Sequence, residues 1–118
     1  MKMFYEDGGR GPTAEEAREV DVRAARDAWA DLRGKRGNFF GLIDDQSRTL
    51  QLYFDESIPD GVDDASHLEI VTLDFPLAAK RGSLQRKVSI GEASELIAKA
   101  FEVGADPERF MPLEFMAW

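Results

Sequence analysis

The sequence predicts a single α+β domain with a mainly antiparallel sheet of four to six strands and two helices packed on one face. Short apolar runs with a two-residue alternation are joined by turns, which is typical of antiparallel strands. Two longer segments carry apolar residues at three- and four-residue steps behind a capping motif, as amphipathic helices do. A chain of 118 residues is long enough to bury one core, so we expect one domain spanning residues 1–118.

The chain is expected to begin with a short strand and a long helix. Met1–Tyr5 is apolar and aromatic enough for a strand, and the glycine-rich turn Gly8–Pro12 follows it. Thr13 and Glu16 have the spacing of a capping box, in which each side chain accepts a hydrogen bond from an otherwise unpaired backbone N–H. The spacing therefore predicts that a helix starts at Thr13 and ends at about Arg33.

Alternating apolar residues predict four further strands in the middle of the chain. The first two form a hairpin around the turn Asp44–Ser47. A loop containing Pro59 and Gly61 separates the second strand from the third. The strands are expected at Asn38–Asp44, Arg48–Asp55, His67–Phe75 and Leu84–Ile90. We expect the face of the sheet away from the helices to carry Gln51, Tyr53, Glu69 and Lys87.

A second helix and an apolar tail complete the expected fold. Ser89 and Glu92 repeat the capping-box spacing, which predicts a helix over about Glu92–Val103. The tail Asp106–Trp118 holds too much apolar area to be left in water. This favours a closing strand on the sheet, with an exposed partner-binding patch as the alternative. The predicted core includes Trp29, Leu50, Leu52, Phe54, Leu96, Ile97 and Phe101.

Composition narrows the classes of function. The formal net charge of -8 would repel phosphate groups, so direct nucleic-acid binding is not expected. The chain has no cysteine, which excludes disulfides and thiolate chemistry. It carries neither a recognisable signal peptide nor an apolar run of the length that spans a membrane, so we expect a cytoplasmic protein without a membrane partner.

No catalytic motif emerges from the sequence. The only histidine, His67, has no serine or cysteine nucleophile in a recognisable motif with it. The glycines of Gly8–Pro12 lack the lysine and the hydroxyl residue of a nucleotide-binding phosphate loop. We therefore expect neither enzymatic activity nor a cofactor.

Carboxylates are concentrated between two of the expected strands. A calcium-binding loop needs oxygen ligands, a glycine and a glutamate at fixed positions, and this segment does not fit that register. The alternatives are a solvated connection and a recognition element for a basic partner. For recognition, we expect Asp44 and Asp45 in the neighbouring turn to extend the acidic surface, whereas Tyr53 and the C-terminal aromatic residues are the alternative binding surface if the loop is only a solvated connection. The candidate partner-binding residues are Asp44, Asp45, Tyr53, Asp55, Glu56, Asp60, Asp63 and Asp64.

Three features carry a resemblance to a class of small proteins. These are the turn Gly8–Pro12 ahead of the first helix, the pair Leu50-Gln51 in a hairpin strand, and a final segment running from the Ser89-capped helix through Phe101, Gly104 and Pro107 to Trp118. In these features the chain resembles small bacterial immunity proteins of polymorphic and contact-dependent toxin systems. The resemblance implies a non-catalytic cytoplasmic protein without a cofactor that neutralises a cognate toxin by occluding its active site or substrate surface.

Because this chain is acidic, we expect such a toxin to present a basic surface to it. A small-molecule-binding or structural accessory domain without a toxin partner is the alternative. An enzyme built only on carboxylates is a third reading. The sequence does not predict whether the protein associates with itself.

Overall fold

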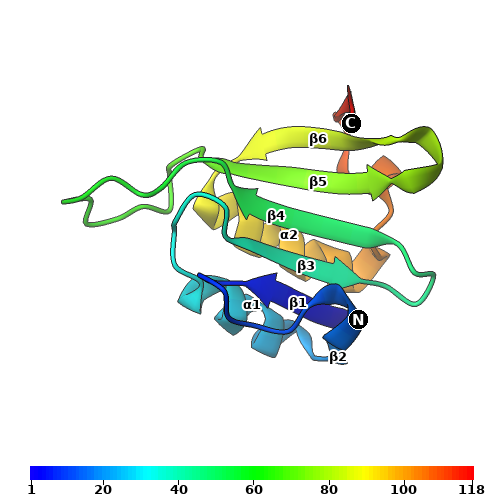
Figure 1. Ribbon diagram of the computed structural model, residues 1–118, viewed down its shortest axis with the longest axis horizontal. Coiled ribbons are helices and arrows are strands. Elements are labelled where there is room, and N and C mark those ends of the chain that lie inside the picture. The colour runs from blue at the N-terminus through cyan, green and yellow to red at the C-terminus, as the bar shows by residue number, and fades with distance from the viewer.

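The computed structural model describes residues 1–118 and contains one seven-stranded antiparallel sheet with two helices on one face (Figure 1). The strand order is β2-β1-β3-β4-β5-β6-β7. The predicted α+β class is confirmed, and the sheet has one strand more than the upper end of the expected range. The strands are β1 (Lys2–Glu6), β2 (Arg18–Glu19), β3 (Phe39–Ile43), β4 (Thr49–Phe54), β5 (Val71–Leu77), β6 (Gly82–Val88) and β7 (Glu114–Ala117). The helices are α1 (Val22–Asp31) and α2 (Ile90–Val103), and single 3-10 turns lie at Ala14–Glu16, Ala78–Lys80 and Pro107–Phe110.

The core lies between the sheet and the two helices. Alternate residues of β4 and β5 point into it, and Leu52 and Leu73 are fully buried. The Trp29 ring of α1 stacks on Phe54, with ring centroids 5.3 Å apart, and its Nε1 donates a hydrogen bond to the Ile90 carbonyl at 3.2 Å. Six of the seven predicted core residues are buried, whereas Phe101 is only partly buried. Neither helix is long and apolar enough to cross a membrane.

The predicted start of the first helix is wrong. Glu16 Oε1 accepts hydrogen bonds from the backbone N–H and the hydroxyl of Thr13, both at 3.1 Å, but these contacts support only a 3-10 turn. The chain then extends as β2, which pairs with the free edge of β1. The helix α1 begins after Asp21, whose Oδ1 accepts from the Ala24 N–H at 2.8 Å. Strand pairing with β1 therefore outweighs the local helix signal.

The predicted third strand also begins too early. His67–Ile70 does not join the sheet, and β5 starts at Val71. The carbonyls of Ser66 and Leu68 accept hydrogen bonds from the first backbone N–H groups of α2 instead, at 2.8 and 3.1 Å. These carbonyls complement the side-chain cap that the Ser89 hydroxyl provides, at 3.0 Å from the Glu92 nitrogen, which is the serine half of the predicted capping box. The Glu92 carboxylate pairs with Arg86 instead, and α2 starts at Ile90, two residues before the predicted start. Glu69, which precedes β5, is therefore not part of the sheet face on which it was expected.

The apolar tail closes the sheet, as the sequence favoured. β7 pairs antiparallel with β6, with Leu84 opposite Phe115 and Gln85 opposite Glu114. Phe110, just before β7, is buried against Phe75 with ring centroids 5.2 Å apart. All four residues of β7 are nevertheless exposed, so this strand forms an open edge of the sheet.

Candidate functional site

The face of the sheet away from the helices carries a polar group of side chains from β4, β5 and β6. The strand register places Tyr53 opposite Thr72, Asp74 opposite Gln85, and Thr72 opposite Lys87. Asp55, directly after β4, continues the same alternation. We call these six residues the open-face cluster: Tyr53, Asp55, Thr72, Asp74, Gln85 and Lys87.

One half of the open-face cluster is centred on a buried carboxylate. Asp74 is only 6% exposed. Gln85 Nε2 donates a hydrogen bond to Asp74 Oδ1 at 2.7 Å and lies 3.4 Å from the Tyr53 hydroxyl oxygen. Asp74 forms no ion pair, so a neutral amide is its hydrogen-bonding partner. A carboxylate held this way can accept a cation or a further donor that approaches the open face.

The other half of the cluster contains Asp55, which the sequence placed in a partner-binding loop. Its Oδ2 accepts a hydrogen bond from the Thr72 hydroxyl at 2.8 Å and forms an ion pair with Lys87. Its Oδ1 is buried and has no hydrogen-bond partner. Asp55 is thus anchored on the sheet, and its charge is compensated within the chain.

The remaining predicted loop carboxylates lie on a segment that projects from one end of the sheet between β4 and β5 (Figure 1). Glu56, Asp60 and Asp63 are exposed, and their side chains form no hydrogen bond or ion pair. Asp64 is also exposed, and its Oδ1 accepts from the Ser66 backbone N–H at 3.0 Å. This bond is the main cause that lowers the pKa of Asp64.

The base of this loop is held by contacts that do not use its carboxylates. The Ile58 N–H donates to the Gly34 carbonyl at 2.8 Å, and the Ser57 hydroxyl accepts from the Arg36 N–H at 2.9 Å. The acidic side chains are therefore presented by a backbone anchored through neutral groups.

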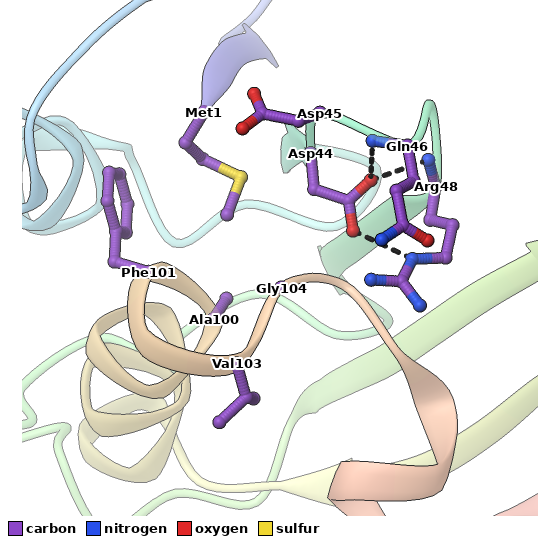
Figure 2. A pocket seen from close by; sticks show the side chains of 9 residues that line it. All are labelled: Met1, Asp44, Asp45, Gln46, Arg48, Ala100, Phe101, Val103 and Gly104. Atoms are coloured by element: carbon purple, nitrogen blue, oxygen red, sulfur yellow. Dashed lines mark hydrogen bonds and ion pairs between the residues drawn. The ribbon is translucent and has the colours of Figure 1, made fainter.

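Asp44 and Asp45 do not extend this acidic surface, because they lie in the β3–β4 turn at the opposite end of β4 (Figures 1 and 2). The side chain of Asp44 is 7% exposed. Its Oδ2 accepts from Arg48 Nε at 2.8 Å and from the Ala105 backbone N–H at 2.9 Å, and its Oδ1 accepts from the Gln46 and Arg48 N–H groups at 3.0 and 2.9 Å. Asp44 is thus a structural link between this turn and the end of α2.

The protonation of Asp44 reflects the same contacts. Burial opposes its ionisation, but the hydrogen bonds from Arg48 and Ala105 outweigh that effect and lower the pKa of Asp44. Beside it, a cavity of about 320 Å³ is lined by Met1, Asp45 and Phe101, among others, and Figure 2 shows these side chains around the space. Phe101 forms a wall of this cavity, which accounts for its partial exposure.

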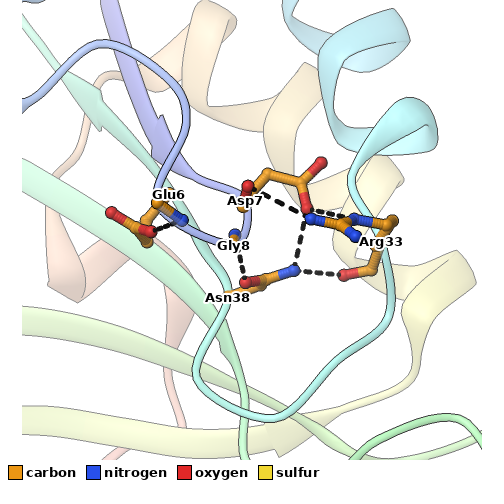
Figure 3. Close-up of polar contacts among 6 residues, drawn as sticks. Glu6, Asp7, Gly8, Arg33 and Asn38 are labelled. Atoms are coloured by element: carbon orange, nitrogen blue, oxygen red, sulfur yellow. Dashed lines mark hydrogen bonds and ion pairs between the residues drawn. The ribbon is translucent and has the colours of Figure 1, made fainter.

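A second structural network surrounds Asn38 and was not predicted from the sequence (Figure 3). The Asn38 side chain accepts from the Gly8 N–H at 3.0 Å and donates to Asp7 Oδ1 at 3.0 Å and to the Arg33 carbonyl at 2.9 Å. Arg33 Nε donates to the same Asp7 oxygen at 2.8 Å, and this contact is the main cause that lowers the pKa of Asp7. The network holds the glycine turn after β1 in place.

The residues considered for catalysis and metal binding do not converge. His67 is exposed in the turn that precedes β5. No group of three or more histidine, cysteine, aspartate or glutamate side chains is arranged to hold a metal ion. A phosphate loop at Gly8–Pro12 is also not formed, since these residues make a turn closed by the pair Asp7 and Arg10 rather than the start of a helix.

Exposed apolar side chains are concentrated at the C-terminal edge of the sheet. Five large apolar side chains in the protein are markedly exposed, and four of them belong to residues 111–118. Trp118 is 70% exposed, although its Nε1 donates a hydrogen bond to the Ser83 hydroxyl at 3.1 Å. The other three are Met111, Phe115 and Met116.

Comparison with known proteins identifies no relative: no protein-family model, no curated protein and no solved structure matches the chain.

Proposed function

We propose that this protein is a non-catalytic immunity protein that binds a cognate bacterial toxin and covers its active site or substrate surface. The observation that carries the proposal is the projecting loop, on which Glu56, Asp60, Asp63 and Asp64 are all exposed. Their carboxylates form no ion pair within the chain. A basic cleft that normally receives an anionic substrate would provide the missing cations.

The charge of the loop supports this reading on physical grounds. Residues 55–69 contain six acidic residues and no lysine or arginine. Like charges this close in sequence repel one another, so they oppose the folded arrangement. Because the loop is anchored through Ile58 and Ser57, the carboxylates of Glu56, Asp60 and Asp63 are not needed to hold it. A cationic partner would relieve the repulsion and would be steered toward the loop during encounter.

The open-face cluster offers a second contact region that is continuous with the loop. Asp55 joins the loop to Tyr53 along the same strand face. Asp74 lies on the neighbouring strand and has no cationic partner. A toxin seated on the loop and reaching over Tyr53 would place a lysine or arginine within range of Asp74.

The test is binding kinetics against the cognate toxin domain that the proposal requires, sought in the neighbouring reading frames and measured at low and high salt. Replacing Asp60, Asp63 and Asp64 together by asparagine should slow association by about tenfold at low salt and flatten its salt dependence. The asparagine at position 64 keeps the side-chain oxygen that accepts from Ser66, so the loop geometry is retained.

A matched control carries the same change in charge on the helical side of the molecule. Asp27, Asp31 and Glu102 are exposed and form no hydrogen bond or ion pair through their side chains. Replacing them by Asn, Asn and Gln should leave association much less affected. If the two triple variants associate at the same rate, the loop is a solvated connection and the proposed binding surface is wrong.

A cavity on the open face supports small-molecule binding as a second candidate function. Its volume is about 350 Å³, and its lining includes the rings of Phe4 and Phe39 and the amide of Gln51. This volume is at the lower end of the range for ligand sites. A thermal-shift screen of small metabolites, repeated with Phe39→Ala, tests it: a hit must lose its effect in the variant.

A further inference from the structure

The two edge strands of the sheet differ in how well they resist pairing with a strand of another molecule. At one end, β2 is only two residues long and consists of Arg18 and Glu19. A short, charged edge of this kind resists pairing with another strand. At the other end, β7 is four residues long and carries the apolar side chains of Phe115 and Met116. No lysine or proline lies within β7, and Glu114 is its one charged residue.

The backbone of β7 has free hydrogen-bonding groups on its outer side. In an antiparallel ladder, alternate residues direct both N–H and C=O toward the same neighbour. The Trp118 N–H donates to the Arg81 carbonyl at 2.9 Å, so Met116 and Glu114 share that orientation toward β6. Phe115 and Ala117 therefore direct their N–H and C=O groups away from the sheet.

We propose that this edge pairs with β7 of a second copy, antiparallel and about a two-fold axis through Phe115. In that register, the outward backbone groups of Phe115 bond to those of its symmetry mate, and Ala117 of each copy bonds to Leu113 of the other. The two sheets become one continuous sheet, with the helices of both copies on the same face. In this register no charged side chain of one copy lies opposite a side chain of the same charge in the other copy.

The side chains brought together are complementary. On the helix face, Phe115 meets Phe115 of the second copy. On the open face, Met116 lies opposite the aliphatic part of Glu114, and Trp118 lies opposite Pro112. The strand contributes one charged residue per copy, and the nearby cations Arg86 and Lys87 are already paired with Glu92 and Asp55.

The exposed area is sufficient for a weak, specific dimer. Large apolar and aromatic side chains present about 150–250 Å² each when fully exposed. With exposed fractions from 45% to 70%, the side chains of Phe115, Met116 and Trp118, which the register brings into contact, offer about 350 Å² per copy. Two copies would bury about 700 Å² before the paired backbone and neighbouring residues are counted, at the small end of weak, transient interfaces.

Sedimentation equilibrium over a wide concentration range tests the proposal with the full chain. We expect a monomer–dimer equilibrium with a Kd between about 1 and 100 μM, as for interfaces of this size. Ala117→Pro removes an outward N–H without breaking the β6–β7 ladder, and Phe115→Lys places a charge on the axis. Each should raise the Kd at least about tenfold. Far-UV circular dichroism checks that both variants are folded.

Val22→Lys is the matched control, because Val22 is the one exposed large apolar residue outside the C-terminal segment, at 38%. It should leave the Kd unchanged. A wild-type protein that stays monomeric up to about 1 mM, or variants at Phe115 and Ala117 that dimerise as well as wild type, would overturn the proposal.

Oxidative cross-linking gives an independent readout because the chain has no cysteine. Phe115→Cys places two thiols across the axis, where paired Cα atoms lie about 5.5 Å apart, within the range that a disulfide spans. Phe115→Cys should therefore form a covalent dimer much faster than Val22→Cys at equal concentration. Equal rates for the two variants would show that β7 does not pair with itself in this register.

Discussion

Replacing Asp44 by asparagine tests whether this carboxylate holds the β3–β4 turn to the end of α2. Asparagine has the same size, and its oxygen can still accept from one pair of donors. Its amide group, however, must face the other pair, so two charge-assisted hydrogen bonds are lost. Hydrogen bonds to charged groups contribute about 1.5–3 kcal/mol each, and Arg48 is partly exposed to solvent, so we expect a loss of about 2–4 kcal/mol in unfolding free energy.

The assay is urea unfolding followed by far-UV circular dichroism, with Asp45→Asn as the control. Asp45 is the adjacent residue, is exposed and makes no side-chain hydrogen bond, so its replacement should change the unfolding free energy by less than about 0.5 kcal/mol. Both variants change the net charge by the same amount. Equal stabilities for the two variants would refute the structural role of Asp44.

The pH dependence of the same difference gives a second check. The pKa of Asp44 is lowered from its ordinary value of 3.8 in the folded protein. A lowered carboxyl pKa contributes stability that is fully present above the unfolded pKa and is lost as pH falls through the folded pKa. The difference between wild type and Asp44→Asn should therefore be constant from pH 7 to about 5 and shrink below about pH 4. A difference in unfolding free energy that persists unchanged to pH 2 would show that the ionised Asp44 carboxylate is not its cause.

Three further substitutions test the packing and the polar network by urea unfolding. Leu52→Ala should lower the unfolding free energy by about 2–5 kcal/mol, because the Leu52 side chain points from β4 toward the helices and is fully buried. A cost near zero would show that Leu52 is not part of the core. Gly41→Ala should cost about 1–3 kcal/mol, since a Cβ atom at Gly41 would lie 2.0 Å from the buried Phe4 ring, and an unchanged stability would show that the ring moves freely. Asn38→Ala should cost about 1–3 kcal/mol by leaving the Gly8 N–H and the Arg33 carbonyl without this partner, and a neutral result would mean that water replaces the amide.

The elements that were predicted correctly are those whose signal is local. The hairpin of β3 and β4 follows from alternation around a polar turn, and α2 follows from its Ser89 cap and apolar stripe. The start of α1 could not be settled in this way. Thr13 and Asp21 are both suitable N-cap residues, and the choice between them depends on whether the residues between can pair with β1. That pairing is a non-local interaction, which local periodicity does not report.

The same distinction applies to the candidate site. Alternation placed Tyr53 and Lys87 on the open face, but the contact between Asp74 and Gln85 depends on the register between β5 and β6. The separation of Asp44 from the acidic loop could have been deduced. A six-residue strand spans about 20 Å, so the turn before β4 and the loop after it must lie at opposite ends of the sheet. The burial of Asp44, in contrast, requires Ala105 and hence the tertiary fold.

The two proposed surfaces are compatible, and together they fix the geometry of a complex. The acidic loop follows β4, and the pairing edge is β7, which lies three strand spacings or about 14 Å away across the sheet. A two-fold axis at the β7 edge is perpendicular to the sheet, so it directs the loops of the two copies toward opposite ends of the joined sheet. One toxin could not contact both loops, and each loop would bind its own. The stoichiometry of the complex, measured by sedimentation at concentrations where the dimer forms, should therefore be two to two. One toxin bound per dimer would show that at least one of the two surfaces is wrongly assigned. Two variants would then separate them, because Ala117→Pro should lose only the dimer, whereas replacing Asp60, Asp63 and Asp64 by asparagine should weaken only toxin binding.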